Sequence, residues 1–229
     1  MGEKKKKEES MKTVKKVLIV GACVLFVVLM ILSGMGSSWL TMFTSVKPGD
    51  LVTLDYTLYD AGGKSIVTSE KSVYDTAIAQ NRQIFGSKQL TIISNQTMEK
   101  PIYSVPVYPS AGTSVQQLGI FSSEFNVISS GILGMKVNEQ KKIPLSSNIS
   151  MTQTWSVEQL ALSKINLTDV SVGDNFYMGF SDNPGDATNA TSASTYMRIV
   201  GVTNKSPEGV VVDFSYPVMD VRVVSINQR

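Results

Sequence analysis

Residues 131–146, GILGMKVNEQKKIPLS, place three different elements within one short stretch. The apolar run at 132–135 has the composition of a helix end, and the segment around Asn138 is typical of a tight turn. A basic and then apolar strand start follows, and Pro144 closes it, as is usual for a strand at the edge of a sheet. The segment therefore predicts a helix, a tight turn and an edge strand in direct succession.

A second constraint is the uncharged stretch after Lys16. The chain has 229 residues, of which 42% are apolar and 17% charged, which is enough for one or two compact domains and an extra segment. The window 17–40 contains the apolar run VLIVGACVLFVVLMIL, and a bilayer core takes about 20 apolar residues as a helix. The window is therefore predicted to be a transmembrane helix, with the lipid bilayer as a partner.

Three alternatives to a membrane anchor stay open. A cleaved signal peptide would use the small residues at 33–37, although its apolar region is usually shorter. A lipoprotein would use Cys23, but Lys16 stands close before it and the residues after it stay apolar. A buried core helix would place the lysine cluster beside the core. Cys23 is the only cysteine, so the rest of the chain has no thiol chemistry and needs no disulfide.

Charge predicts the orientation. Seven lysines precede the window and only Lys47 follows it closely, and cytoplasmic flanks carry the excess of Lys and Arg. Residues 1–16 are therefore predicted to be a cytoplasmic tail of a single-pass protein of the cell membrane, with the body from residue 46 outside the cell. Without the tail's seven Lys and three Glu, 14 basic residues stand against 16 acidic ones, which argues against nucleic acid as a partner.

Five Asn-x-Ser/Thr triplets suit an exterior location, where such sites can carry glycans. They begin at Asn95, Asn148, Asn166, Asn189 and Asn204. Since the chain is rich in Ser and Thr, some of these triplets arise by chance.

The segment 50–59 alternates polar and apolar residues as a strand does, and the turn signal at 60–63 closes a hairpin. The sequence VKPGDLVTLDYTLYDAGGKSIVTS at 46–69 and the segment 131–146 resemble, in the same order, the opening strands and the later helix of FKBP-type peptidyl-prolyl isomerases. The resemblance implies an α+β fold, in which an antiparallel half-barrel surrounds a short helix. It also implies that the activity is cis-trans isomerisation of the peptide bond before proline. The clients would be proline-containing or unfolded polypeptides.

Two segments depart from the basic family pattern. Residues 70–115 form a long insertion, in which we expect a helix at 72–80 and strands at 89–94 and 102–108; prolonged versions of this segment occur in archaeal members. Residues 151–216 resemble the insert-in-flap domain of the SlyD type, a small β-rich domain that interrupts the fold and captures unfolded chains. The FKBP-like domain would then comprise residues 46–150 and 217–229.

When the residues of the family's substrate pocket are matched to this sequence position by position, most of the matching residues are apolar. Tyr56 matches the pocket tyrosine, whereas Val67 stands where the family has an aspartate and Ile149 where it has a tyrosine, so both polar anchors are lost. Phe125 takes the position whose backbone N–H binds the substrate carbonyl. The whole set is Tyr56, Ile66, Val67, Phe125, Ile128, Ile149 and Met219. Ordinary burial in a core explains Tyr56, Ile66, Val67, Ile128 and Met219 equally well.

Prolyl isomerisation needs no cofactor. Its barrier of about 18–20 kcal/mol comes from amide resonance, and an apolar pocket lowers it by favouring the twisted amide. The chain has no histidine, which argues against histidine triads and histidine metal sites, so we expect neither metal nor cofactor. Two functions stay open: a membrane-anchored extracytoplasmic isomerase and chaperone for exported proteins, and a catalytically impaired module that binds unfolded polypeptide or an envelope partner.

Overall fold

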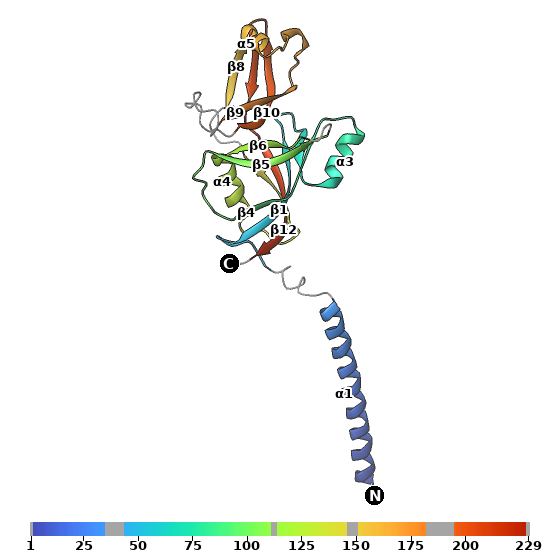
Figure 1. The fold of residues 1–229 in the computed structure, drawn as a ribbon. Coiled ribbons are helices and arrows are strands. Elements are labelled where there is room, and N and C mark those ends of the chain that lie inside the picture. The colour runs from blue at the N-terminus through green and yellow to red at the C-terminus, as the bar shows by residue number, and fades with distance from the viewer. Residues whose placement is uncertain (1, 35–43, 111–113, 146–150, 182–194, 228–229) are drawn as a thin grey trace. The chain divides into compact units, whose positions relative to one another are not determined.

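The computed structural model describes residues 2–34, 44–110, 114–145, 151–181 and 195–227 (Figure 1). Its contacts divide the chain into two compact units, residues 1–44 and residues 45–229.

The first unit has one described element, α1 (Gly2–Gly34), which contains both the lysine-rich tail and the apolar stretch. Exposed apolar side chains are described along α1 from residue 17 to residue 30. Over the described residues, no helix combines the length and the apolar character needed to cross a membrane. The predicted fold class is therefore wrong in its transmembrane helix at 17–40. The predicted location of the body outside the cell stays a prediction.

The second unit contains the strands and the remaining helices of the described chain. The strands are β1 (Leu51–Tyr59), β2 (Ser65–Thr68), β3 (Phe85–Ser87), β4 (Leu90–Ile93), β5 (Ile102–Pro109), β6 (Gln116–Phe121), β7 (Gln140–Pro144), β8 (Thr152–Ser156), β9 (Asn175–Ser181), β10 (Thr195–Ser206), β11 (Gly209–Asp213) and β12 (Val218–Asn227). The helices are α3 (Lys71–Ala79), α4 (Ser122–Gly131), α5 (Val157–Leu162) and the short 3-10 helix η1 (Leu167–Asp169). The unit therefore mixes helices with a sheet that contains most of its elements.

Hydrogen bonds join the strands in the order β7-β12-β1-β2-β3-β5-β6-β10-β11-β8, with β4 beside β1 and β9 beside β10. β1 pairs with β12 along its whole length, and its other edge is shared between β4 and β2. The pairs β2–β3 and β6–β10 are parallel, and the remaining pairs are antiparallel. The sheet curls into a half-barrel, and α4 packs against β5, β6 and β7 (Figure 1). β7 lies at one end of the order, so the edge strand expected before Pro144 is confirmed.

Local residue chemistry explains the turns. Between β1 and β2, the Asp60 carboxylate accepts the Lys64 N–H at 2.8 Å, and Gly63 adopts a φ of 73°, which glycine tolerates without a steric cost. Between α4 and β7, Asn138 has a φ of 67°, a conformation that asparagine accepts more readily than most residues. Both turns were predicted from the sequence, and the structure confirms them.

The second unit has two hydrophobic cores. The larger core lies inside the half-barrel and draws on β1, β2, β4, β5, β6, α4 and β12. The smaller core joins α5, β10 and β11, and its buried members are Leu160, Val170, Val200, Val202, Val210 and Val212. β10 contributes to both, because Met197 and Ile199 belong to the larger core and Val200 and Val202 to the smaller one. β10 is thus the strand through which the two cores are joined.

Arg198 lies at this junction and is fully buried. Its guanidinium makes a two-pronged ion pair with the Glu124 carboxylate, at 2.5 and 3.0 Å, and donates to the carbonyls of Phe214 at 2.6 Å and Gly119 at 2.9 Å. The rings of Phe121 and Tyr216 lie on it, with centroids 4.0 and 4.1 Å away. Because Glu124 is on α4 and Arg198 on β10, this buried pair ties the half-barrel helix to the joining strand.

Candidate functional site

The structure brings most of the predicted pocket residues together, but inside the larger core. Tyr56, Val67, Ile128 and Met219 are completely inaccessible to solvent, and Ile66 and Phe125 are nearly so. All six belong to one continuous cluster. Ile149, the seventh, lies outside the described residues. The six described positions are therefore packed in the interior, as ordinary burial in a core predicts, and Ile66 also borders a cavity.

Tyr56 has its polar atom engaged within the protein. Its hydroxyl donates to Ser87 Oγ at 2.6 Å, and the Ser87 hydroxyl donates in turn to the Lys88 carbonyl at 2.8 Å. Burial raises the pKa of Tyr56 to about 12, against a smaller lowering by the Ser87 hydrogen bond. The phenol is therefore neutral at ordinary pH and already has a hydrogen-bond acceptor.

Phe125 and Ile128 lie on the inner face of α4. The Phe125 ring lies against the Tyr103 ring of β5, with centroids 4.7 Å apart, and Ile128 is buried one turn later. Both side chains anchor the helix to the sheet, so a ligand could not reach them without displacing α4.

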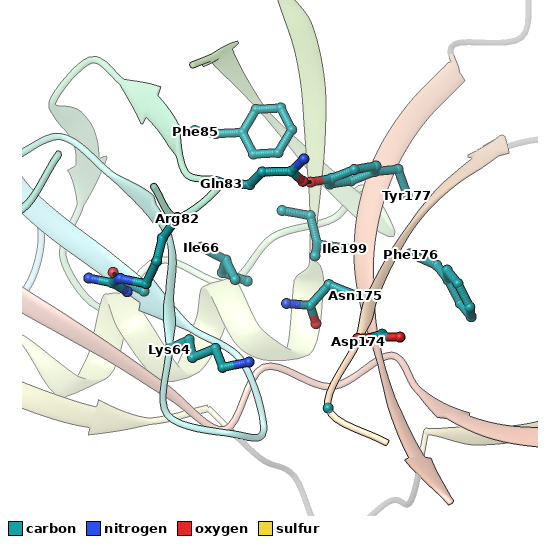
Figure 2. A pocket seen from close by; sticks show the side chains of 12 residues that line it. Lys64, Ile66, Arg82, Gln83, Phe85, Asp174, Asn175, Phe176, Tyr177 and Ile199 are labelled. Carbon is teal, nitrogen blue, oxygen red and sulfur yellow. Dashed lines mark hydrogen bonds between the residues drawn. The ribbon is translucent and has the colours of Figure 1, made fainter. Parts of the chain in front are cut away.

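A cleft of about 440 Å³ lies between the half-barrel and the smaller β lobe (Figure 2), within the range of small-molecule and peptide sites. One wall comes from β2 and the segment leading into β3, and the other from the start of β9. Ile66 on β2, Phe85 on β3 and Ile199 on β10 contribute its buried apolar surface. The cleft thus combines residues more than 100 positions apart in the sequence.

Direct contacts hold the two walls of the cleft together. The Tyr177 ring meets the Phe85 ring edge to face at 5.5 Å, and its hydroxyl donates to the Gln83 side-chain oxygen at 2.7 Å. Asn175 Nδ2 donates to the buried carboxylate of Asp60 at 2.9 Å. About half of the Tyr177 side chain stays exposed, so its ring offers a ligand an accessible aromatic surface with a fixed orientation.

The polar rim carries two cations and one carboxylate, those of Lys64, Arg82 and Asp174. Arg82 donates only to neutral groups among the described residues, Gln80 Oε1 at 2.9 Å and Ser65 Oγ at 3.3 Å. The Asp174 carboxylate accepts the Ser171 N–H at 2.6 Å. Figure 2 shows the Lys64 side chain reaching toward Asn175, with Arg82 on the same side of the cleft as Lys64.

The start of β9 lines the cleft, and the edge of β9 away from β10 pairs with no described strand. Among the described strands, β9 pairs with β10 alone, from Asn175 opposite Gly201 to Ser181 opposite Thr195. Backbone groups of the other edge can therefore bond an extended chain that lies beside the cleft.

Three residues that supply the apolar and aromatic surface of the cleft were not predicted from the sequence, namely Phe85, Tyr177 and Ile199. Tyr177 had a local signal, since it is the half-exposed member of the aromatic run NFYMGF on a strand. Phe85 and Ile199 had none, because their place in the cleft depends on the pairing of β3 with β5 and of β10 with β9.

Other predicted site features are only partly described. In the described part of the chain, no group of three or more His, Cys, Asp or Glu side chains could hold a metal ion. Three asparagines of the triplets, Asn95, Asn166 and Asn204, have exposed positions, and Asn166 also accepts the Thr168 N–H at 3.2 Å. Asn148 and Asn189 lie outside the described residues. Glycan addition at these sites stays a prediction.

Comparison with known proteins gives the chain no family. No family model matches it, and no curated protein matches it. The resemblance to prolyl isomerases therefore rests on the sequence patterns at 46–69, 131–146 and 151–216.

Proposed function

We propose that this protein is a polypeptide-binding module built on an FKBP-like half-barrel, and that it holds extended segments in the cleft between the half-barrel and the smaller lobe. The observation that carries the proposal is the composition of this cleft. Ile66, Phe85 and Ile199 supply apolar surface, Tyr177 supplies an exposed ring, and polar side chains surround them. A few directed polar groups around an apolar floor are typical of ligand sites.

The geometry suits an extended chain better than a compact molecule. A segment lying along the open edge of β9 can exchange backbone hydrogen bonds with it and place alternate side chains into the cleft. A proline or another apolar side chain would lie between Tyr177 and Ile66. Apolar burial of about 25 cal/mol per Å² would supply the attraction, and the backbone bonds would supply the alignment.

Prolyl isomerisation is the second candidate, because Ile66, a predicted pocket residue, borders the cleft and the reaction needs only an apolar site for a twisted amide. Two observations place it second. The hydroxyl of Tyr56 is bonded to Ser87, and Val67 has no atom that can accept a hydrogen bond from a substrate. Poor positioning of this kind can cost about a hundredfold in rate.

Binding can be measured by fluorescence anisotropy of a labelled proline-containing peptide added to the full-length chain. We expect Tyr177→Ala to weaken binding at least fivefold, since an accessible aromatic anchor is worth more than about 1 kcal/mol. Tyr108→Ala is the matched control, because Tyr108 is similarly exposed on β5 and does not border the cleft. Equal losses in both variants, or none in either, would contradict the proposed site.

A protease-coupled assay on a proline peptide separates the two candidates. A rate equal to the uncatalysed one, combined with binding that depends on Tyr177, supports the binding module. A rate increase that Tyr177→Ala abolishes supports the isomerase. Suppression of aggregation of an unfolded client protein measures the same binding on a long chain, and we expect Tyr177→Ala to reduce it.

A further inference from the structure

We propose that the cleft prefers polypeptide segments with an acidic side chain next to the apolar residue that it holds. This inference rests on the polypeptide binding proposed above and adds a sequence preference to it. The carboxylates around the cleft accept hydrogen bonds from the protein itself, whereas its cations have no acidic partner among the described residues.

The carboxylates near the cleft each accept at least one donor from the protein itself. Asp60 is buried, and its two oxygens accept the Lys64 N–H at 2.8 Å and Asn175 Nδ2 at 2.9 Å. Asp174 accepts the Ser171 N–H at 2.6 Å, and Figure 2 shows its carboxylate turned away from Lys64. A basic side chain of a ligand would have to compete with these donors at Asp60, whereas at Asp174 a donor is described for one oxygen only.

The cations of the cleft, in contrast, have no acidic partner in the described part of the chain. Neither Lys64 nor Arg82 belongs to any of the ion pairs there. Lys64 is exposed, and its ammonium reaches toward the cleft (Figure 2). Arg82 donates two of its five N–H groups to neutral oxygens. A carboxylate on a bound segment would therefore meet the unused donors of Lys64 on the wall that β2 helps to form.

Lys64 is the better residue for testing this preference, because it points into the cleft from the turn that follows β1. No hydrogen bond or ion pair of its ammonium is described, so its substitution should not affect folding. An exposed ion pair is weak, so we expect about a 2- to 5-fold preference for an acidic over a neutral side chain. The preference should shrink at high ionic strength, because salt screens exposed charges.

The test uses three labelled peptides that differ only in having Glu, Gln or Lys beside a Leu-Pro pair, titrated into the full-length chain. The expected order of affinity is Glu, then Gln, then Lys. In Lys64→Glu the order should reverse. In the control Lys100→Glu, which changes an exposed lysine that does not border the cleft, it should be kept.

The outcomes separate the preference from the binding itself. Equal affinities for all three peptides in the unchanged protein, or a Glu preference that survives Lys64→Glu, would overturn the preference while leaving the cleft as a binding site. Failure of every peptide to bind would overturn the proposed function together with the preference.

Discussion

The pair formed by Arg198 and Glu124 should stabilise the protein as one unit, and breaking it from either side should be costly. The Arg198 side chain is fully buried and that of Glu124 almost so. Removing one partner of such a pair leaves an uncompensated buried charge, which costs about 3–5 kcal/mol. We therefore expect Glu124→Gln and Arg198→Met each to lower the free energy of unfolding by about this amount. In a chain of this size the midpoint of thermal unfolding would fall by roughly 6–20 °C.

The double variant gives the sharper result. Gln at position 124 keeps an oxygen for the Phe121 N–H, which Glu124 now accepts at 3.0 Å. Met at position 198 removes the charge, although the carbonyls of Phe214 and Gly119 lose their donor. Since no net charge is then buried, the double variant should be about as stable as either single one. The interaction energy in the cycle should be about 3 kcal/mol.

Urea unfolding of the full-length chain in a Trp39→Phe background provides the assay. The chain has two tryptophans, so Trp155, packed against the smaller core, would be the only tryptophan signal, while circular dichroism follows the sheet. Additive effects of the two substitutions, with an interaction below about 1 kcal/mol, would refute the reasoning about the buried pair.

Three further predictions concern other parts of the second unit. Gly209→Ala should destabilise the protein by at least about 3 kcal/mol, because the φ of Gly209 is 153° and a Cβ would stand 1.9 Å from the Trp155 carbonyl oxygen. The control Gly63→Ala, which has open space around the added Cβ, should cost only about 1–2 kcal/mol in the same urea experiment. Tyr56→Phe should destabilise the protein by about 1 kcal/mol at pH 7, since it leaves the Ser87 hydroxyl without its donor. The pKa of Tyr56 is raised from 10.0 to about 12 in the folded state, so its neutral form stabilises the protein below pH 10 and this contribution is lost as the pH rises toward 12. The free energy of unfolding, measured by urea titrations from pH 9 to 12, should therefore fall by up to about 2–3 kcal/mol more in the unchanged protein than in Tyr56→Phe. Equal slopes of this free energy against pH would contradict the assignment.

The sequence predicted those parts of the fold that are fixed by local chemistry. The helix expected at 72–80 is α3, the strands expected at 89–94 and 102–108 are β4 and β5, and the turn before β7 forms where Asn138 allows it. The last strand, β12, lies within residues 217–229, which were expected to return to the FKBP-like domain. In each case a turn residue or an alternating apolar pattern lies within the segment itself, so no distant contact was needed to recognise it.

The parts that depend on distant contacts could not be predicted. Arg198 stands in the apolar strand sequence YMRIVGV, and nothing nearby shows that its partner is Glu124, 74 residues earlier. The cleft likewise needs the pairing of β9 with β10 and of β3 with β5 before Tyr177 can reach Phe85. The predicted transmembrane helix was wrong, since no helix of the described chain has the length and apolar character that a membrane span needs.

The six described residues of the predicted pocket lie inside the larger core. Tyr56, Val67, Ile128 and Met219 were selected by position in a motif, and they do lie together, but with no access from solvent. Apolar residues on the inner face of a curled sheet usually pack into the hydrophobic core. A binding site forms only where a second element faces the sheet across an open space. Here β9 provides that wall, beside Ile66.

The central claim, that extended polypeptide binds between the half-barrel and the smaller lobe, is tested most directly by NMR. A proline-containing peptide would be titrated into the isotopically labelled full-length chain while backbone amide shifts are followed. The account predicts that the largest changes fall on residues 64–66, 82–85 and 173–177, from both walls of the cleft. Changes confined to one wall or located elsewhere in the chain, or no changes at peptide concentrations well above millimolar, would contradict it.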